Sequence, residues 1–147
     1  MAGSRCWWPV YRHPYPSVLA PLFYTGTPET PSSLAFPVQL GDLAHARRLS
    51  CGMFPRPLAK SISRGIACGL SHMHDHYIIH RDLKPQNVLI GTNDVGVLIP
   101  RIADCGWARS MRDAAGGASQ PPSGDRGLTP GAVTPVWRPL EIELGLQ

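Results

Sequence analysis

The residues that could do chemistry are concentrated between positions 80 and 87. They read His-Arg-Asp-Leu-Lys-Pro-Gln-Asn, which places a carboxylate at Asp82, an ammonium group at Lys84 and an amide at Asn87. A positioned carboxylate can accept a proton, and a lysine can neutralise the negative charge of a phosphate group. An isolated Asp-Lys pair is usually part of a solvated turn, so the interpretation depends on the whole segment and its spacing.

This segment resembles the catalytic loop of protein kinases, whose pattern is H-R-D-L-x-x-x-N. Its fixed positions would all match by chance at only about one start in a million. The resemblance implies that Asp82 accepts or orients the proton of the attacking hydroxyl, that Lys84 lies near the transferred phosphoryl group, and that Asn87 binds Mg²⁺. Lysine followed by proline is similar to the serine/threonine branch of the family. We therefore expect a serine/threonine protein kinase that uses ATP and Mg²⁺.

A second motif, Asp104-Cys105-Gly106, lies 22 residues after Asp82 and follows an Arg-Ile-Ala run. It resembles the D-F-G segment that ends a strand and opens the activation segment of kinases. The resemblance implies that Asp104 binds the Mg²⁺ that bridges the nucleotide phosphates, and that Gly106 gives the activation segment its backbone freedom. Cys105 replaces the phenylalanine of the family, and its smaller side chain predicts looser packing against His80.

A third, partial match covers residues 133–141 and resembles the end of the activation segment, usually T-x-x-Y-R-A-P-E. Thr134 and Glu141 keep the spacing of seven, with Arg138 between them. The resemblance implies that Thr134 bonds the catalytic aspartate and shapes the substrate pocket, and that Glu141 pairs with an arginine much later in a complete domain. Arg138 and the Glu-Ile-Glu-Leu-Gly run are similar to the cyclin-dependent and mitogen-activated kinase group.

The stretch before the catalytic loop matches the family more weakly. Residues 34–40, followed by Gly-Asp-Leu, resemble the strand, hinge and first helix of the large lobe. On that interpretation Val38 offers backbone groups to adenine and Asp42 reaches the ribose, although an ordinary loop and strand explain the stretch equally well. No G-x-G-x-x-G and no V-A-I-K-like lysine precede the loop, because Lys60 and Lys84 are the only lysines. The phosphate-holding lysine of the family is therefore missing.

One strong helix is predicted to support the catalytic loop, over residues 58–74. Apolar residues recur at spacings of 4, 4 and 3 from Ile62 to Met73, which makes one apolar stripe. Gly65 and Gly69 weaken the helix by about 1 kcal/mol each relative to alanine. Their small size also permits another segment to pack closely against the helix.

The remaining expected elements are short. A second helix is predicted over 42–49, a turn over 91–94 and a loop over 25–33. Strands are predicted over 18–24, 34–40, 77–79, 87–90 and 95–102. Residues 110–130 are rich in Gly, Ala, Ser and Pro, which favours a mobile loop.

Length, composition and charge set the wider limits. The 147 residues fit one small domain, and the 15 glycines and 16 prolines predict irregular stretches. A net charge of +4 without a basic stripe does not favour a nucleic-acid partner, and no apolar run is long enough to cross a membrane. The four cysteines form no C-x-x-C pair, and no secretion signal is present. We expect an intracellular protein, cytoplasmic or nuclear, with reduced thiols.

These features predict an α+β fold, namely a partial protein-kinase-like fold with mostly the start of the helical large lobe and a few short strands. Residues 1–33 are expected to form an irregular Pro-rich N-terminal segment. Residues 34–147 are expected to form a partial protein kinase domain, from the hinge to the end of the activation segment. The expected partners are a protein substrate bearing Ser or Thr and a regulatory protein, with no nucleic acid and no membrane.

Two other interpretations remain open. The chain could be an inactive kinase-derived fragment that acts as a protein-interaction module, because the apolar face of the long helix needs packing partners. A metal site is a further alternative, because four histidines are close in the sequence and two of them are one helical turn apart. These four are His72, His74, His76 and His80. Cations at the end of a helix suit its dipole, which explains the first three histidines without a metal.

Overall fold

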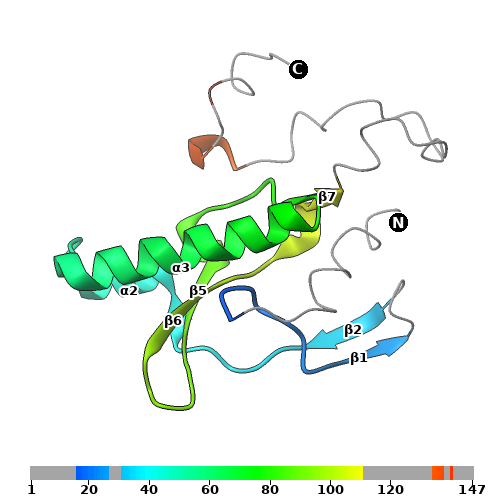
Figure 1. Cartoon of the computed structure of the whole chain (residues 1–147), viewed down its shortest axis with the longest axis horizontal. Helices are drawn as coiled ribbons and strands as arrows, with labels where there is room; N and C mark the ends of the chain where they lie inside the picture. Colours follow the sequence, from blue (N-terminus) through cyan, green and yellow to red (C-terminus); the bar gives the residue numbers. More distant parts are fainter. Residues whose placement is uncertain (1–15, 27–30, 111–133, 138–139, 141–147) are drawn as a thin grey trace.

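The computed structural model describes residues 16–26, 31–110, 134–137 and 140 (Figure 1). In chain order the elements are β1 (Phe23–Gly26), β2 (Pro31–Ala35), β3 (Gly41–Asp42), α2 (Leu43–Leu49), α3 (Arg56–Asp75), β4 (Ile78–Ile79), the short 3₁₀ helix η1 (Pro85–Asn87), β5 (Val88–Thr92), β6 (Leu98–Ile102), η2 (Cys105–Trp107), β7 (Arg109–Ser110) and η3 (Pro135–Trp137).

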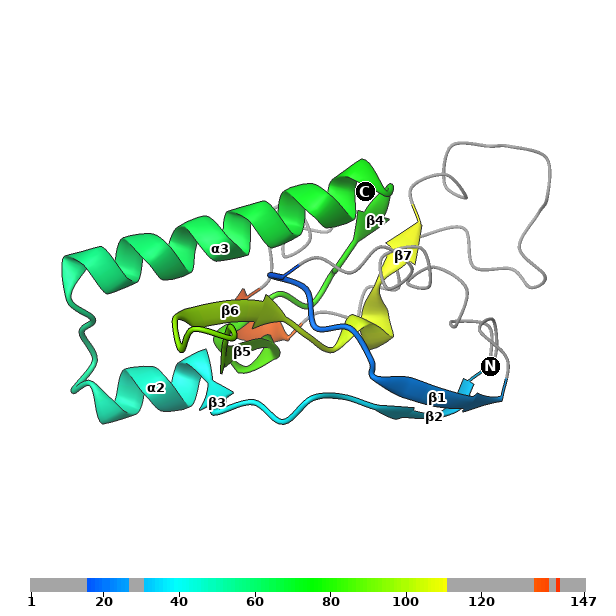
Figure 2. The same ribbon diagram turned by 60° about the horizontal axis from the view of Figure 1, so that its bottom comes forward.

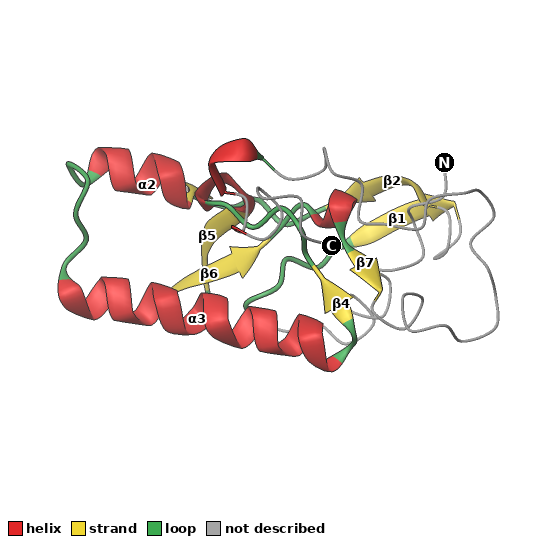
Figure 3. Cartoon of the chain, turned by 90° about the horizontal axis from the view of Figure 1, so that it is seen from above, coloured by secondary structure: helices red, strands yellow, loops and turns green. Residues whose placement is uncertain are grey.

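The strands form three small antiparallel sheets. In one, β5 lies between β3 and β6, with Val88 opposite Ile102 and Gly41 opposite Ile90. The other two are the pairs β1–β2 and β4–β7. Figures 2 and 3 show the β5–β6 hairpin between the two helices, with β1 and β2 to one side. Short antiparallel sheets combined with helices confirm the predicted α+β class.

Helix α3 is the longest element, and the prediction of a helix over 58–74 is confirmed. It begins two residues earlier, at Arg56, because Pro57 is tolerated in a first turn, where its missing N–H has no helical partner. The predicted close packing at Gly69 is also present. A Cβ atom there would lie 2.7 Å from the main-chain oxygen of Ser17 and 3.0 Å from Cδ1 of Ile102.

Helix α2 confirms the prediction of a short helix over 42–49. Asp42 is its N-cap residue, and its carboxylate accepts a hydrogen bond of 2.7 Å from the backbone N–H of His45. Such a cap satisfies a backbone donor that has no partner inside the helix. The bond therefore explains why the helix begins at Leu43.

The connection between β5 and β6 lies later than predicted. The expected turn over 91–94 is wrong, since β5 continues to Thr92 and β6 begins at Leu98. The side chain of Asn93 accepts hydrogen bonds from the backbone N–H groups of Val95 and Val97, at 3.2 Å and 2.8 Å. An asparagine that bonds nearby backbone in this way closes the turn at its own position.

The β1–β2 hairpin corrects the predictions for the first forty residues. The loop expected over 25–33 is wrong at both ends, where Thr25 pairs with Ser33. The strand expected over 34–40 ends at Ala35, two residues before Pro37, whose missing N–H cannot continue a ladder. Of the strand expected over 18–24, only the last two residues lie in β1, while Val18 forms an isolated bridge with Ile102.

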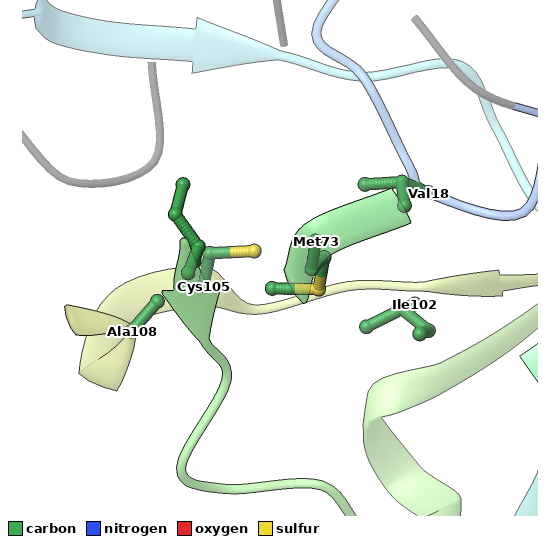
Figure 4. Close-up of a cluster of buried hydrophobic side chains, with 6 residues drawn as sticks. Val18, Met73, Ile102, Cys105 and Ala108 are labelled. Atoms are coloured by element: carbon green, nitrogen blue, oxygen red, sulfur yellow. The ribbon is translucent and has the colours of Figure 1, made fainter. Parts of the chain in front are cut away.

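A buried apolar cluster joins the end of α3 to β6 and η2 (Figure 4). Its members are Val18, Met73, Ile78, Ile102, Cys105 and Ala108. Figure 4 shows Met73 at the centre of the cluster, where it is 0% exposed. Because Cys105 is buried here, the cluster anchors the chain on both sides of Asp104. The looser packing expected at Cys105 stays a prediction.

Candidate active site

Three polar side chains of the segment 80–87 are buried. The exposed fraction is 2% for His80, 3% for Asp82 and 7% for Asn87. The segment connects β4 to β5 and ends in η1. Buried polar groups require hydrogen-bond partners, so the contacts of these three residues define how the loop is held.

The carboxylate of Asp82 lies at the centre of a closed network. The ammonium group of Lys84 donates to Oδ2 of Asp82 at 2.6 Å and to the hydroxyl of Thr134 at 2.8 Å. The Thr134 hydroxyl donates to Oδ1 of Asp82 at 2.7 Å, and the Thr134 backbone N–H adds a bond of 3.3 Å. The contact expected between Thr134 and Asp82 is therefore present, although the two residues are 52 positions apart.

These bonds decide the charge of Asp82. Burial by itself would raise the pKa of this carboxyl, but the hydrogen bonds from Lys84 and Thr134 outweigh burial and hold the pKa below its ordinary value of 3.8. Asp82 is therefore ionised at neutral pH. A buried carboxylate with a perturbed pKa beside a lysine is typical of a functional site.

The amide of Asn87 is oriented by the same carboxylate. Its nitrogen donates to the main-chain oxygen of Asp82 at 2.8 Å and to Oδ2 of Asp82 at 3.1 Å. Because the nitrogen makes both bonds, the amide oxygen is left for another partner. Asn87 also accepts a bond of 2.9 Å at its main-chain oxygen from the backbone N–H of Ala103, the residue before Asp104.

His80 connects the two acidic segments, a role that the sequence did not reveal. The backbone N–H of Asp82 donates to Nδ1 of His80 at 3.3 Å. The proton of the imidazole is therefore on Nε2, which donates to the main-chain oxygen of Ala103 at 2.9 Å. Burial lowers the pKa of His80 below 6.5 and outweighs the raising effects of the Ala103 carbonyl and the charges of Asp104 and Asp82. A neutral imidazole therefore positions both segments.

Asp104 has a left-handed backbone, with φ 60° and ψ 64°. This conformation is uncommon for a residue other than glycine and costs about 1 kcal/mol or more. The residue is exposed, and its Oδ1 accepts a hydrogen bond of 3.4 Å from the backbone N–H of Gly106. The buried neighbours on both sides, Ala103 and Cys105, hold the strained residue in place.

The donor groups at this end of β5 and β6 fit a magnesium ion. The Asp104 carboxylate and the Asn87 amide oxygen are hard oxygen donors, which Mg²⁺ prefers. Their segments are joined by the bond between Ala103 and Asn87 and by the pairing of Val88 with Ile102.

The histidines at the end of α3 do not form such a donor set. Across the described residues, no three His, Cys, Asp or Glu side chains gather closely enough to hold a metal. The rings of His72 and His76 lie 4.5 Å apart, and Nδ1 of His76 donates to the main-chain oxygen of His72 at 2.8 Å. This bond commits one nitrogen of His76 to the helix.

The other predicted site residues that the structure describes are not members of the Asp82 network. Val38 is 98% exposed, and Asp42 is engaged as the cap of α2. Gly106 is exposed in η2. Arg138 and Glu141 lie outside the described residues, as does nearly all of the loop predicted over 110–130.

No helix in the described part of the chain is long and apolar enough to cross a membrane.

Sequence comparison gives several kinase relatives. Over 61 residues the chain is 46% identical to the serine/threonine-protein kinase ATG1c of Arabidopsis thaliana. The aligned region covers 42% of the chain and 8% of that protein. It is 47% identical over 60 residues to human rhodopsin kinase GRK1, covering 41% of the chain and 10% of the relative.

A longer match is to the human serine/threonine-protein kinase DCLK3, at 40% identity over 74 residues, or 50% of the chain and 11% of the relative. The chain thus spans about a tenth of the length of the relatives it matches. The family model described as the protein kinase domain matches residues 27–142. Because that match covers most of the chain, the chain belongs to the protein kinase domain family.

Proposed function

We propose that this chain carries the catalytic loop of a serine/threonine protein kinase, which transfers a phosphoryl group from ATP to a serine or threonine hydroxyl of a protein. The observation that carries the proposal is the buried, ionised Asp82 held between Lys84 and Thr134. The family match and the serine/threonine kinases among the relatives support the same reaction.

Asp82 would act on the acceptor hydroxyl. Its two oxygens already accept four hydrogen bonds, one from Lys84, one from Asn87 and two from Thr134. An incoming hydroxyl would replace one of these bonds and donate to Asp82, which would orient the hydroxyl oxygen for attack and take its proton as the new phosphorus–oxygen bond forms. The bond between that phosphorus and the ADP oxygen breaks in the same transfer.

Lys84 and Asn87 would complete the site. The Lys84 ammonium group, fixed by two hydrogen bonds, can offset negative charge on the transferred group. Asn87 and Asp104 would hold Mg²⁺, which when bound would neutralise negative charge on the phosphate groups of ATP. His80 positions the segments that carry Asn87 and Asp104, through its hydrogen bonds with the backbone of Asp82 and Ala103.

One observation favours the alternative, an inactive kinase-derived fragment that acts as an interaction module. The chain contains two lysines, one in the Asp82 network and the other, Lys60, exposed on α3. Neither lies before the catalytic loop on a strand, as the phosphate-holding lysine of the family does. The choice between kinase and module therefore depends on whether phosphoryl transfer is measurable.

The test is phosphate incorporation by the purified chain from labelled ATP and Mg²⁺ into a degenerate serine/threonine peptide library. Asp82→Asn keeps the shape of the side chain and removes the base, so we expect a loss of about 100-fold or more. Ser61→Ala, an exposed change on α3, serves as the matched control and should keep the full rate. Equal incorporation by the chain and by Asp82→Asn would reject the kinase proposal and favour the module.

The narrower assignments are proposals as well. Membership of the cyclin-dependent and mitogen-activated kinase group is supported by the Lys-Pro-Gln-Asn run that ends at Asn87, and by Arg138 and residues 141–145, which the structure does not describe. A regulatory protein partner is supported by the exposed apolar residues of the described chain, among them Leu49 at 73% and Met53 at 79%.

A further inference from the structure

A pocket of about 360 Å³ lies beside the Asp82 network and is not used by the mechanism above. It is formed by α2 and its following turn, by η1 and by η3. The lining residues that matter here are Arg47, Arg48, Pro85, Gln86 and Trp137. The pocket thus combines two cations with apolar walls.

The pocket is positively charged, and its charge is not neutralised by the described chain. Neither Arg47 nor Arg48 forms a salt bridge with a carboxylate of the described residues, and no acidic residue lines the pocket. Arg47 donates from Nε to the main-chain oxygen of Gly52 at 3.3 Å, and Nη2 of Arg48 lies 3.5 Å from Nδ1 of His45. Other donors of both guanidinium groups remain for a ligand.

The pocket adjoins the reacting carboxylate through two segments. Pro85 and Gln86 directly follow Lys84, and Trp137 comes three residues after Thr134. Lys84 and Thr134 both bond the carboxylate of Asp82. An extended peptide advances about 3.3 Å per residue, so a substrate whose hydroxyl reaches Asp82 can place a neighbouring residue in the pocket.

We propose that this pocket selects substrates with an acidic side chain a few residues from the serine or threonine that is phosphorylated. The inference rests on the proposed function. Arginine pairs with carboxylates through two parallel hydrogen bonds, which gives both affinity and geometric selection. The apolar faces of Pro85 and Trp137 provide a surface for the peptide chain itself.

The test measures peptide binding without nucleotide, by fluorescence anisotropy with the purified 147-residue chain. One labelled peptide carries a central serine with glutamate at the three positions on each side, and the second has glutamine at those positions. We expect the glutamate peptide to bind about tenfold more tightly. The double variant Arg47→Glu/Arg48→Glu should abolish this preference.

The control is Arg56→Glu/Arg64→Glu, which makes the same change of net charge with two exposed arginines on α3. It should keep most of the preference. Equal loss in both double variants would show an effect of overall charge and would overturn the proposal, as would equal binding of the two peptides by the unmodified chain.

A milder variant covers the case in which the double substitution unfolds α2. Arg48→Gln leaves the bond from Arg47 to Gly52 intact, and it should reduce the preference about threefold. Unchanged preference in this variant, with its circular dichroism also unchanged, would reject the pocket.

The inference and the proposed function can fail separately. Arginine-dependent binding by a chain that phosphorylates no peptide would reject the kinase proposal and keep the pocket as an acidic-peptide site. Phosphorylation that does not depend on glutamate in the peptide would reject the pocket and keep the kinase proposal.

Discussion

The proposed catalytic loop (residues 80–87) and the hinge-like segment before α2 (residues 34–42) are held in different ways. In the loop, Asp82 and Asn87 are buried, and partners as distant as Thr134 bond to them. In the hinge-like segment, Val38 is 98% exposed and Asp42 serves a local helix cap. The comparison teaches that the described chain organises the residues proposed to act on the acceptor hydroxyl, whereas Val38 and Asp42, which were expected to contact adenine and ribose, belong to no comparable network.

The first way to break this contrast is to remove the core beneath the loop. Met73→Ala empties a fully buried position in the cluster that anchors Asp104, so we expect the free energy of unfolding to fall by about 3 kcal/mol. Urea unfolding followed by circular dichroism measures the change. Met53→Ala, at a position 79% exposed, is the control and should change stability by less than about 0.5 kcal/mol. Equal effects of the two would show that the cluster does not support the loop.

A second change removes one member of the network and keeps its shape. Thr134→Val eliminates the hydroxyl that donates to Asp82 and accepts from Lys84, which removes one charge-assisted hydrogen bond from each of these two groups. We expect a loss of about 2 kcal/mol in urea unfolding. Thr92→Val, at an exposed position, should be nearly neutral. A neutral result for Thr134→Val would mean that the network does not contribute to stability.

The third prediction concerns pH and sharpens the role of His80. Its pKa in the folded chain is lowered by burial, whereas the unfolded histidine binds a proton near 6.5. Because the unfolded state then binds more protons, stability falls as the pH drops below about 6.5, by up to about 1.4 kcal/mol per pH unit.

The measurement is the free energy of unfolding at pH 7.5 and at pH 5.5. His80→Gln, which cannot titrate, should reduce the loss between these two values. His45→Gln, a change at an exposed histidine of α2, should keep it. The assigned role of His80 would be wrong if both variants lost stability as the unmodified chain does.

The smallest effects are expected in the hinge-like segment. Asp42→Ala removes the N-cap of α2 and should cost about 1 kcal/mol, since the His45 N–H loses its partner. Val38→Ala, a few residues away and almost fully exposed, should leave stability within about 0.5 kcal/mol. Urea midpoints of the two variants measured side by side check the order. A larger effect at Val38 would show that this segment is held more firmly than its exposure indicates.

The sequence could predict the features that depend on residues close to one another in the chain. The segment 80–87 and the helix over Arg56–Asp75 are defined by the spacing of nearby residues, so both could be predicted. The β1–β2 hairpin was missed because Pro31 suggested a loop, although proline is tolerated at the first residue of a strand. The bridging role of His80 could not be seen, because its bond to Ala103 spans 23 positions.

The pocket at Arg47 and Arg48 was missed for the same reason. The pocket forms where α2, η1 and η3 lie close together, and no short sequence motif indicates that these elements are neighbours. A pair of adjacent arginines on a short helix was the only signal, and it is typical of an ordinary exposed surface.

The central claim is that Asp82 is an ionised carboxylate, organised before any substrate binds. The direct measurement is an NMR titration of the ¹³C-labelled aspartate carboxyls in the folded chain, assigned with Asp82→Asn and repeated in Thr134→Val. We predict a pKa for Asp82 below its ordinary value of 3.8, and a higher value once the Thr134 hydroxyl is removed. A pKa above 3.8 in the unmodified chain, or no change in Thr134→Val, would contradict the account.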